Sequence, residues 1–159
     1  MRENKLFVQF RELRSQTISF AESVHPDIVD IVPEGFKNSI RWNLGHILVA
    51  WDHGIFPKIN ESRRIPMQYH RMFPKGSRPD DWEEKPPSFQ EIMDRMRLQV
   101  DEIIKASEGK MDDLISKPFL RVKYLRGMFK FHITEEQHHL DCMVRIKEAI
   151  GVVGVPAQN

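Results

Sequence analysis

Apolar residues recur at helical spacing in four long segments, and this periodicity constrains the fold of the chain more than any other feature. Residues three or four positions apart share one face of a helix, so each segment presents an apolar face to a core. No segment shows the alternating pattern of a half-buried strand. The sequence therefore predicts an all-α protein built as a four-helix bundle.

Residues that start or stop helices bound the four predicted helices. Pro26 and Pro57 end the first two, the capping box from Ser88 to Glu91 opens the third, and Gly151 closes the fourth. The helices cover residues 6–24, about 39–56, 89–108 and about 124–150. On the first helix, four polar residues lie largely off the apolar face: Arg11, Glu12, Arg14 and Ser15.

Residues 57–88 hold six of the ten prolines in the chain, which makes a helix in this stretch improbable. The sequence predicts a long Pro-rich crossover between the second and third helices. Such a loop either spans the surface or covers a substrate site, and the residues leave both alternatives open. Residues 110–123 are expected to add a short helical turn around 111–115.

Composition excludes several classes of protein. A chain of 159 residues is expected to form a single domain over residues 1–159. The formal net charge of +1, with both signs interspersed, gives no electrostatic footprint for nucleic acid. The chain has one cysteine, a polar start without a signal sequence, and no apolar run of membrane-spanning length. These three features predict a cytoplasmic protein that does not insert into a membrane.

Three ionisable residues of the fourth predicted helix lie within the apolar stripe. At about 100° per residue, His132, Glu135 and His139 fall within about 40° of Met128. A carboxylate in a core needs a partner, because its desolvation costs several kcal/mol. Two neighbours, residues 136 and 138, fall at the margins of the stripe and are weaker candidates.

Glu135 and His139 are four positions apart, a separation that allows two side chains of one helix to bind the same ion. A third ligand must come from another helix, and His46 on the second helix is the best candidate. His53 shares its row but precedes the exit of that helix. Two histidines and one carboxylate leave coordination positions open, which is typical of a catalytic metal rather than a structural one.

Other interpretations of these residues stay open. A buried ion pair would satisfy Glu135 and His139 without a metal. His132 is either a hydrogen-bonded core residue or a ligand, and Cys142 is either a small buried apolar residue or a ligand or redox group beside the site. A two-metal carboxylate site is not supported, because the third helix offers no core-facing glutamate.

Two segments carry a resemblance to a known family. Ser39-Ile-Arg-Trp-Asn-Leu-Gly-His46-Ile47 and Glu135-Glu-Gln-His-His139-Leu-Asp-Cys-Met143 resemble the DinB/YfiT-like superfamily of metal-binding four-helix bundles. The resemblance implies one divalent ion, commonly nickel or zinc, held by a histidine of the second helix and a His-x-x-x-His pair of the fourth. His46 and His139 match the first and last ligands. Glu135 stands where the family usually has histidine, and His132 or His138 could substitute.

The resemblance also implies a range of functions. Members are described as metal-dependent hydrolases, or as thiol S-transferases and isomerases that use low-molecular-weight thiols such as bacillithiol or mycothiol, and many are homodimers. We therefore expect a metal-dependent enzyme that activates water or such a thiol and acts on a small-molecule substrate. The alternative is a non-catalytic helical bundle that binds a small molecule or a protein partner.

Overall fold

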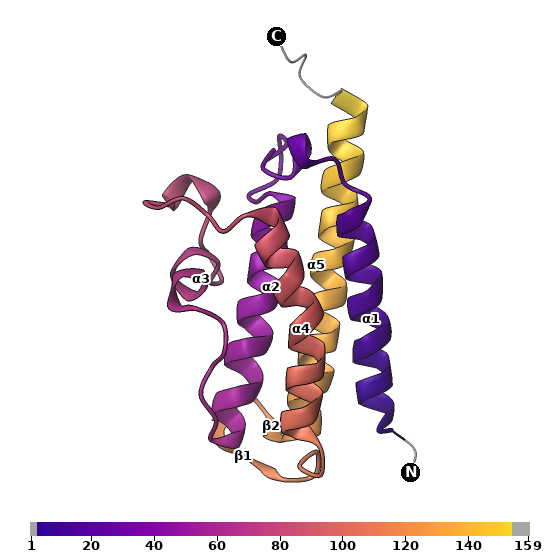
Figure 1. Ribbon diagram of the computed structural model, residues 1–159, viewed down its shortest axis with the longest axis vertical. Helices are drawn as coiled ribbons and strands as arrows, with labels where there is room; N and C mark the ends of the chain where they lie inside the picture. Colours follow the sequence, from indigo (N-terminus) through magenta and orange to yellow (C-terminus); the bar gives the residue numbers. More distant parts are fainter. Residues whose placement is uncertain (1–2, 154–159) are drawn as a thin grey trace.

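The computed structural model describes residues 3–153, and four long helices lie side by side in it (Figure 1). They are α1 (Lys5–Glu22), α2 (Ile40–Ile55), α4 (Phe89–Ser107) and α5 (Leu125–Val153). Both α1 and α2 contact α4 and α5, so the apolar faces of all four helices meet in one core. The predicted mainly helical class is confirmed.

Shorter elements connect the long helices. These are three 3₁₀ segments at Pro26–Ile28, Phe56–Ile59 and Pro79–Asp81, the helix α3 (Met67–Met72), and the strands β1 (Leu114–Phe119) and β2 (Val122–Tyr124). Within residues 3–153, no helix has the length and apolar character needed to cross a membrane.

Side-chain caps begin two of the long helices, α4 at the capping box that the sequence predicts and α2 at Ser39. The Ser39 hydroxyl accepts a hydrogen bond from the Trp42 backbone N–H at 3.1 Å, and the Ser88 hydroxyl accepts one from the Glu91 N–H at 3.1 Å. Each cap satisfies a donor that the first turn of a helix leaves without a partner.

The connection between α2 and α4 differs from the prediction, because it contains the helix α3. The six residues of α3 fit between Pro66 and Pro74. Pro66 is the N-cap, where the missing proline N–H breaks no helical hydrogen bond, so the prolines delimit this helix instead of preventing it. Tyr69 and Phe73 are fully buried and tie the connection to the core.

Two expectations for the last third of the chain are wrong. Residues 114–124 form a two-stranded antiparallel hairpin instead of a helical turn. Most side chains of the two strands are exposed. The strands therefore lack the alternation of apolar and polar residues from which a strand is predicted. In addition, α5 continues through Gly151 to Val153, because Gly151 does not adopt the left-handed backbone that ends α4 at Gly109, where φ is 74°.

Candidate functional site

His46 of α2 and His139 of α5 lie against each other at the interface of the two helices. Their ring centroids are 4.6 Å apart, with 63° between the ring planes. The indole of Trp42, one turn earlier on α2, stacks on the His46 ring at 4.8 Å. Both histidines are half-buried, so the pair lies at the edge of the core with one side open to solvent.

The Nδ1 atom of each histidine is bonded to an oxygen. His46 Nδ1 lies 2.8 Å from the backbone carbonyl of Phe73, and His139 Nδ1 lies 3.0 Å from Asn43 Oδ1. A carbonyl oxygen only accepts hydrogen bonds, and Asn43 Nδ2 donates to the Ser39 carbonyl at 2.8 Å, which fixes the orientation of the amide. Both Nδ1 atoms therefore donate, and both Nε2 atoms keep their lone pairs.

Burial holds both rings in the neutral form. Desolvation lowers the pKa of His46 and outweighs the Phe73 carbonyl and Glu135, which raise it. The pKa of His139 falls to about 3, first through burial and then through electrostatic repulsion between a protonated His139 and its neighbours His46 and His138. A neutral imidazole whose Nδ1–H donates to an oxygen and whose Nε2 is free has the form that binds a metal ion.

Glu135 lies in the same region, one turn before His139 on α5. With His132 and His139 it lines a narrow crevice between α2 and α5, and its charge raises the pKa of His46. Within the described residues its carboxylate makes no hydrogen bond or ion pair, so it is available to a ligand. No three His, Cys, Asp or Glu side chains of that part of the chain are already gathered as a metal-binding cluster.

The deeply buried carboxylate of α5 is Glu136, which the sequence placed at the margin of the stripe. It accepts hydrogen bonds from Arg14 Nη2 at 2.8 Å, Trp51 Nε1 at 2.9 Å and Thr17 Oγ1 at 2.9 Å. Gln99 Oε1 accepts from the same Arg14 guanidinium. The expectation that Arg14 lies off the apolar face is also wrong. Because α5 contacts α1 as well as α2, its margin faces α1 and not solvent.

His132 is buried against α2, and in the part of the chain that the structure describes neither ring nitrogen has a hydrogen-bond partner. It is therefore not the hydrogen-bonded core residue that one interpretation predicted. Burial lowers its pKa to about 3. A Cβ at Gly54 would lie 1.9 Å from His132 Nε2, so only glycine allows α2 to approach this ring.

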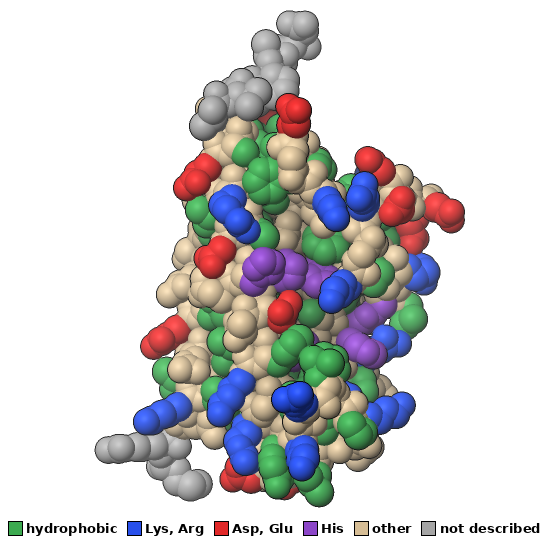
Figure 2. Space-filling model, turned by 180° about the vertical axis from the view of Figure 1, so that it is seen from behind, with side chains coloured by type: hydrophobic (Ala, Val, Ile, Leu, Met, Phe, Trp, Pro, Cys, Tyr) green, Lys and Arg blue, Asp and Glu red, His purple; other side chains and the backbone are tan. Residues whose placement is uncertain are grey.

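The remaining candidates lie nearer the surface. His53 is exposed on α2, and within the described residues no hydrogen bond or ring contact joins it to His46 or His139. Cys142 Sγ lies 3.8 Å from His138 Nε2 and accepts a hydrogen bond from Arg145 at 3.2 Å. Cys142 is half-buried with polar neighbours, so it is not simply a small apolar core residue. Figure 2 shows histidine side chains reaching the surface in two groups on the face seen there.

A family model described as the DinB superfamily matches residues 9–143, which include His46, Glu135 and His139. No curated protein matches the chain.

Proposed function

Since the chain belongs to the DinB superfamily, we propose that it is a metal-dependent enzyme in which His46, Glu135 and His139 hold one divalent transition metal ion. The fold in this proposal is a four-helix bundle with a Pro-rich crossover from α2 to α4. The observation that carries the proposal is the matched state of the two histidines, each neutral and donating through Nδ1 to a fixed oxygen.

The donor set suits nickel or zinc. Two imidazole nitrogens and one carboxylate oxygen are ligands that both ions accept, and they leave coordination positions for a substrate. The Glu135 carboxylate, which has no hydrogen bond or ion pair within residues 3–153, is free to bind an ion. When bound, the ion would supply Lewis-acid activation of water or of a low-molecular-weight thiol.

The chain positions the two histidines through residues around them. The Phe73 carbonyl and the Asn43 amide set the rotation of the rings, and Trp42 covers one face of His46. Phe73 comes from the connection between α2 and α4, and its ring packs so closely on Gly45 that a Cβ there would lie 2.5 Å away. The connection therefore contributes to the site, which favours the substrate-facing alternative over a simple surface loop.

The reaction depends on which molecule the bound ion activates. Activation of water gives a hydrolase, and activation of a low-molecular-weight thiol gives a thiol S-transferase, in each case with a small-molecule substrate. We propose that the protein acts as a homodimer in the cytoplasm. A non-catalytic bundle that binds a small molecule or a protein is the contrasting hypothesis, and metal content separates the two.

The test is the metal content of protein purified without an affinity tag. Elemental analysis is expected to find one nickel or zinc ion per chain in the wild type and to find it lost in His46→Ala and His139→Ala. His25→Ala, on the exposed histidine before the first 3₁₀ segment, is the matched control and is expected to retain the ion. A wild type without bound metal, or alanine variants with unchanged content, would remove the enzyme proposal.

A second assay separates the two reactions. The metal-loaded protein is given an electrophilic model substrate with and without a low-molecular-weight thiol. A rate that requires the thiol indicates the S-transferase, and release of a hydrolysis product without thiol indicates the hydrolase.

A further inference from the structure

The hairpin of β1 and β2 lies across the end of the bundle where α5 begins, and it shares no residue with the histidine site (Figure 1). The strand β1 contacts the 3₁₀ segment Phe56–Ile59, and β2 contacts α5. Three inner side chains of the hairpin pack against the core: Ile115, Phe119 and Val122. The other side chains of the hairpin are exposed, so they form the surface of this end of the molecule.

Three large apolar side chains belong to this exposed set. Leu120 is 79% exposed, Leu114 is 71% exposed and Tyr124 is 38% exposed. Leu114 and Tyr124 are partners in the antiparallel register, so their side chains are neighbours on one face of the hairpin. Figure 2 shows hydrophobic side chains among Lys and Arg side chains at the lower end of the molecule. A concentration of exposed apolar residues in one short element indicates an interaction surface.

Leu120 has a backbone conformation that suits glycine better than leucine. It lies in the two-residue turn between the paired residues Phe119 and Val122, and its φ is 51°. Glycine, asparagine or aspartate is preferred where such a turn requires a positive φ, because a larger side chain is strained there. Packing within the chain does not offset this strain, since the Leu120 side chain is mostly exposed. A strained residue that projects into solvent therefore indicates a contact outside the chain.

Four cations at this end form no ion pair within the described residues: Lys58, Lys117, Arg121 and Lys123. Residues 114–124 contain no aspartate or glutamate. Lys58 Nζ donates to the Lys117 carbonyl at 2.8 Å. Burial, and then the charge of Lys117, lowers the pKa of Lys58. The positive charges are therefore close enough to repel one another.

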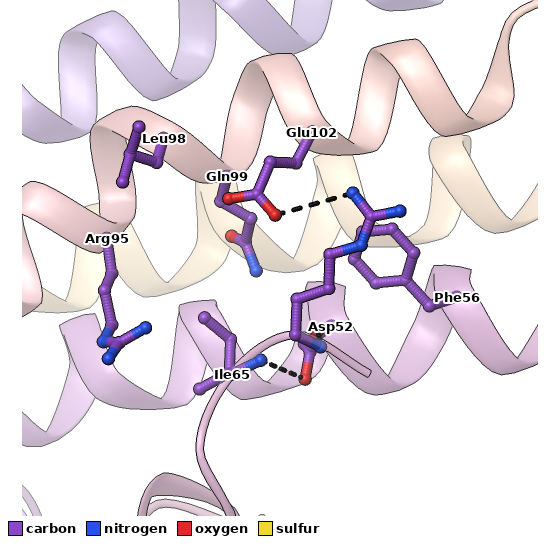
Figure 3. A pocket seen from close by; sticks show the side chains of 8 residues that line it. Asp52, Phe56, Ile65, Arg95, Leu98, Gln99 and Glu102 are labelled. Atoms are coloured by element: carbon purple, nitrogen blue, oxygen red, sulfur yellow. Dashed lines mark hydrogen bonds and ion pairs between the residues drawn. The ribbon is translucent and has the colours of Figure 1, made fainter. Parts of the chain in front are cut away.

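Carboxylates close to the hairpin in sequence or in space are mostly paired already. Asp112 pairs with Arg126 at 2.6 Å, which leaves Asp113 as the counter-charge just before the hairpin. Glu102, drawn in Figure 3, pairs with Arg64 at 3.5 Å. This end of the bundle therefore has an excess of positive charge, which the overall net charge of +1 does not reveal.

We propose that the hairpin end of the bundle adsorbs to the surface of an anionic lipid bilayer. Leu120 enters the interface between headgroups and acyl chains, and Lys117, Arg121 and Lys123 face the lipid phosphates. Peripheral binding of this kind combines buried apolar side chains with attraction between basic residues and anionic lipids. Such adsorption requires no membrane-spanning helix, and none is present within residues 3–153.

Other occupants fit this surface less well. A second copy of the chain would bring like charges together. A stable protein interface uses about 20 to 30 residues a side, whereas the hairpin covers only residues 114–124. A lipid surface needs no matched shape, so a small basic and apolar tip is sufficient for it.

Co-sedimentation of the full-length protein with lipid vesicles tests the proposal. Vesicles of equal parts phosphatidylglycerol and phosphatidylcholine are compared with vesicles of phosphatidylcholine alone. We expect the wild type to bind the anionic vesicles at low salt, to be released by high salt, and to bind the neutral vesicles at least tenfold more weakly. Each basic residue near an anionic surface strengthens adsorption by about fivefold. The variant Lys117→Gln/Arg121→Gln/Lys123→Gln is therefore expected to bind the anionic vesicles at least tenfold more weakly.

A matched control removes three exposed cations elsewhere. Lys37→Gln/Arg78→Gln/Lys85→Gln changes the connections before α2 and before α4, and it is expected to bind the anionic vesicles like the wild type. Circular dichroism verifies the fold of both triple variants.

Leu120→Gly separates lipid contact from stability of the fold. Glycine adopts the positive φ without strain, so the midpoint of thermal unfolding is expected to stay unchanged or to rise. Binding to the anionic vesicles is expected to be at least fivefold weaker, because the apolar side chain is gone.

Several outcomes would overturn the lipid surface. They are absent binding to the anionic vesicles, equal binding to the neutral ones, unchanged binding in the hairpin triple variant or in Leu120→Gly, and an equal loss in the control triple variant. Binding of soluble polyglutamate without binding of vesicles would also overturn it, and would assign the surface to an acidic protein partner.

Discussion

Arg14 of α1 and Glu136 of α5 form a buried ion pair, with Nη2 and Oε1 2.8 Å apart and both side chains 1% exposed. The pair is fully hydrogen-bonded, since Trp51 and Thr17 complete the carboxylate, and the Met96 carbonyl accepts from Arg14. It joins α1 and α5, the first and last long helices in the sequence, across the core. A buried charge of this kind is tolerated only while its partner is present.

Removal of either partner is therefore expected to destabilise the protein strongly. Arg14→Met leaves the Glu136 carboxylate without its counter-charge and should lower the free energy of unfolding by about 3 to 5 kcal/mol. Arg97→Met, which breaks an exposed pair with Glu22, should change it by less than about 1 kcal/mol. Urea unfolding measures both. Similar losses in the two variants would show that burial does not set the strength of the Arg14–Glu136 pair.

The approach of α2 to His132 depends on a residue without a side chain. Gly54→Ala places a Cβ where His132 Nε2 now lies, so the helices must separate, at an expected cost of about 1 to 3 kcal/mol. Gly151→Ala on α5 is the matched control, because its Cβ meets nothing within 4 Å among the described residues and alanine favours a helix. Thermal unfolding is expected to show a lower midpoint for the first variant and an unchanged or higher one for the second.

The low pKa of His132 makes stability depend on pH. The pKa of about 3 in the folded state lies below the ordinary value of 6.5, so the unfolded chain binds more protons between these values. Stability due to neutral His132 is therefore complete above about pH 6.5 and is lost as the pH falls, by at most about 1.4 kcal/mol per pH unit.

The variant His132→Leu isolates this contribution. Urea unfolding of chelator-treated protein at pH 7 and pH 5 should show a smaller loss of stability on acidification in the variant than in the wild type. An equal loss in both proteins would mean that His132 is protonated without opening of the core.

Asp52 anchors the connection that carries Phe73 to the histidine site. Its carboxylate accepts from the backbone N–H groups of Arg64 at 2.7 Å and Ile65 at 3.1 Å, and lies 2.7 Å from His70 Nε2. Asp52→Ala should release this stretch, and hydrogen exchange of the amides in residues 62–75 should become at least tenfold faster. Exchange in α1 serves as the internal reference, and Asp80→Ala, on an exposed carboxylate, is the control. Unchanged exchange of residues 62–75 in Asp52→Ala would contradict this anchoring.

Much of the helical framework was accessible from sequence because it depends on local signals. Ser39 and Ser88 cap helices through hydrogen bonds to residues three positions away, and the long apolar stripes define the faces that α1, α2, α4 and α5 bury. The hairpin of residues 114–124 gave no such signal, because its strands are mostly exposed. The helix α3 is too short to show a period.

For the candidate site, the sequence predicts only what the geometry of a single helix determines. The spacing of Glu135 and His139 follows from helical geometry, and His46 was the best third candidate on the second helix before the resemblance to the family supported the same choice. Burial of Glu136 was not predictable, because it depends on Arg14, which lies 122 residues away in sequence on a facing helix. The Phe73 carbonyl that fixes His46 was also inaccessible, since a backbone acceptor from a distant turn leaves no residue pattern.

Anomalous diffraction from crystals of the zinc- or nickel-loaded protein, collected at the absorption edge of the metal, tests the proposed metal site most directly. We predict a single peak about 2.0 to 2.2 Å from Nε2 of His46, from Nε2 of His139 and from a carboxylate oxygen of Glu135. A peak bound by other side chains, or no peak between these two histidines in loaded protein, would contradict the account.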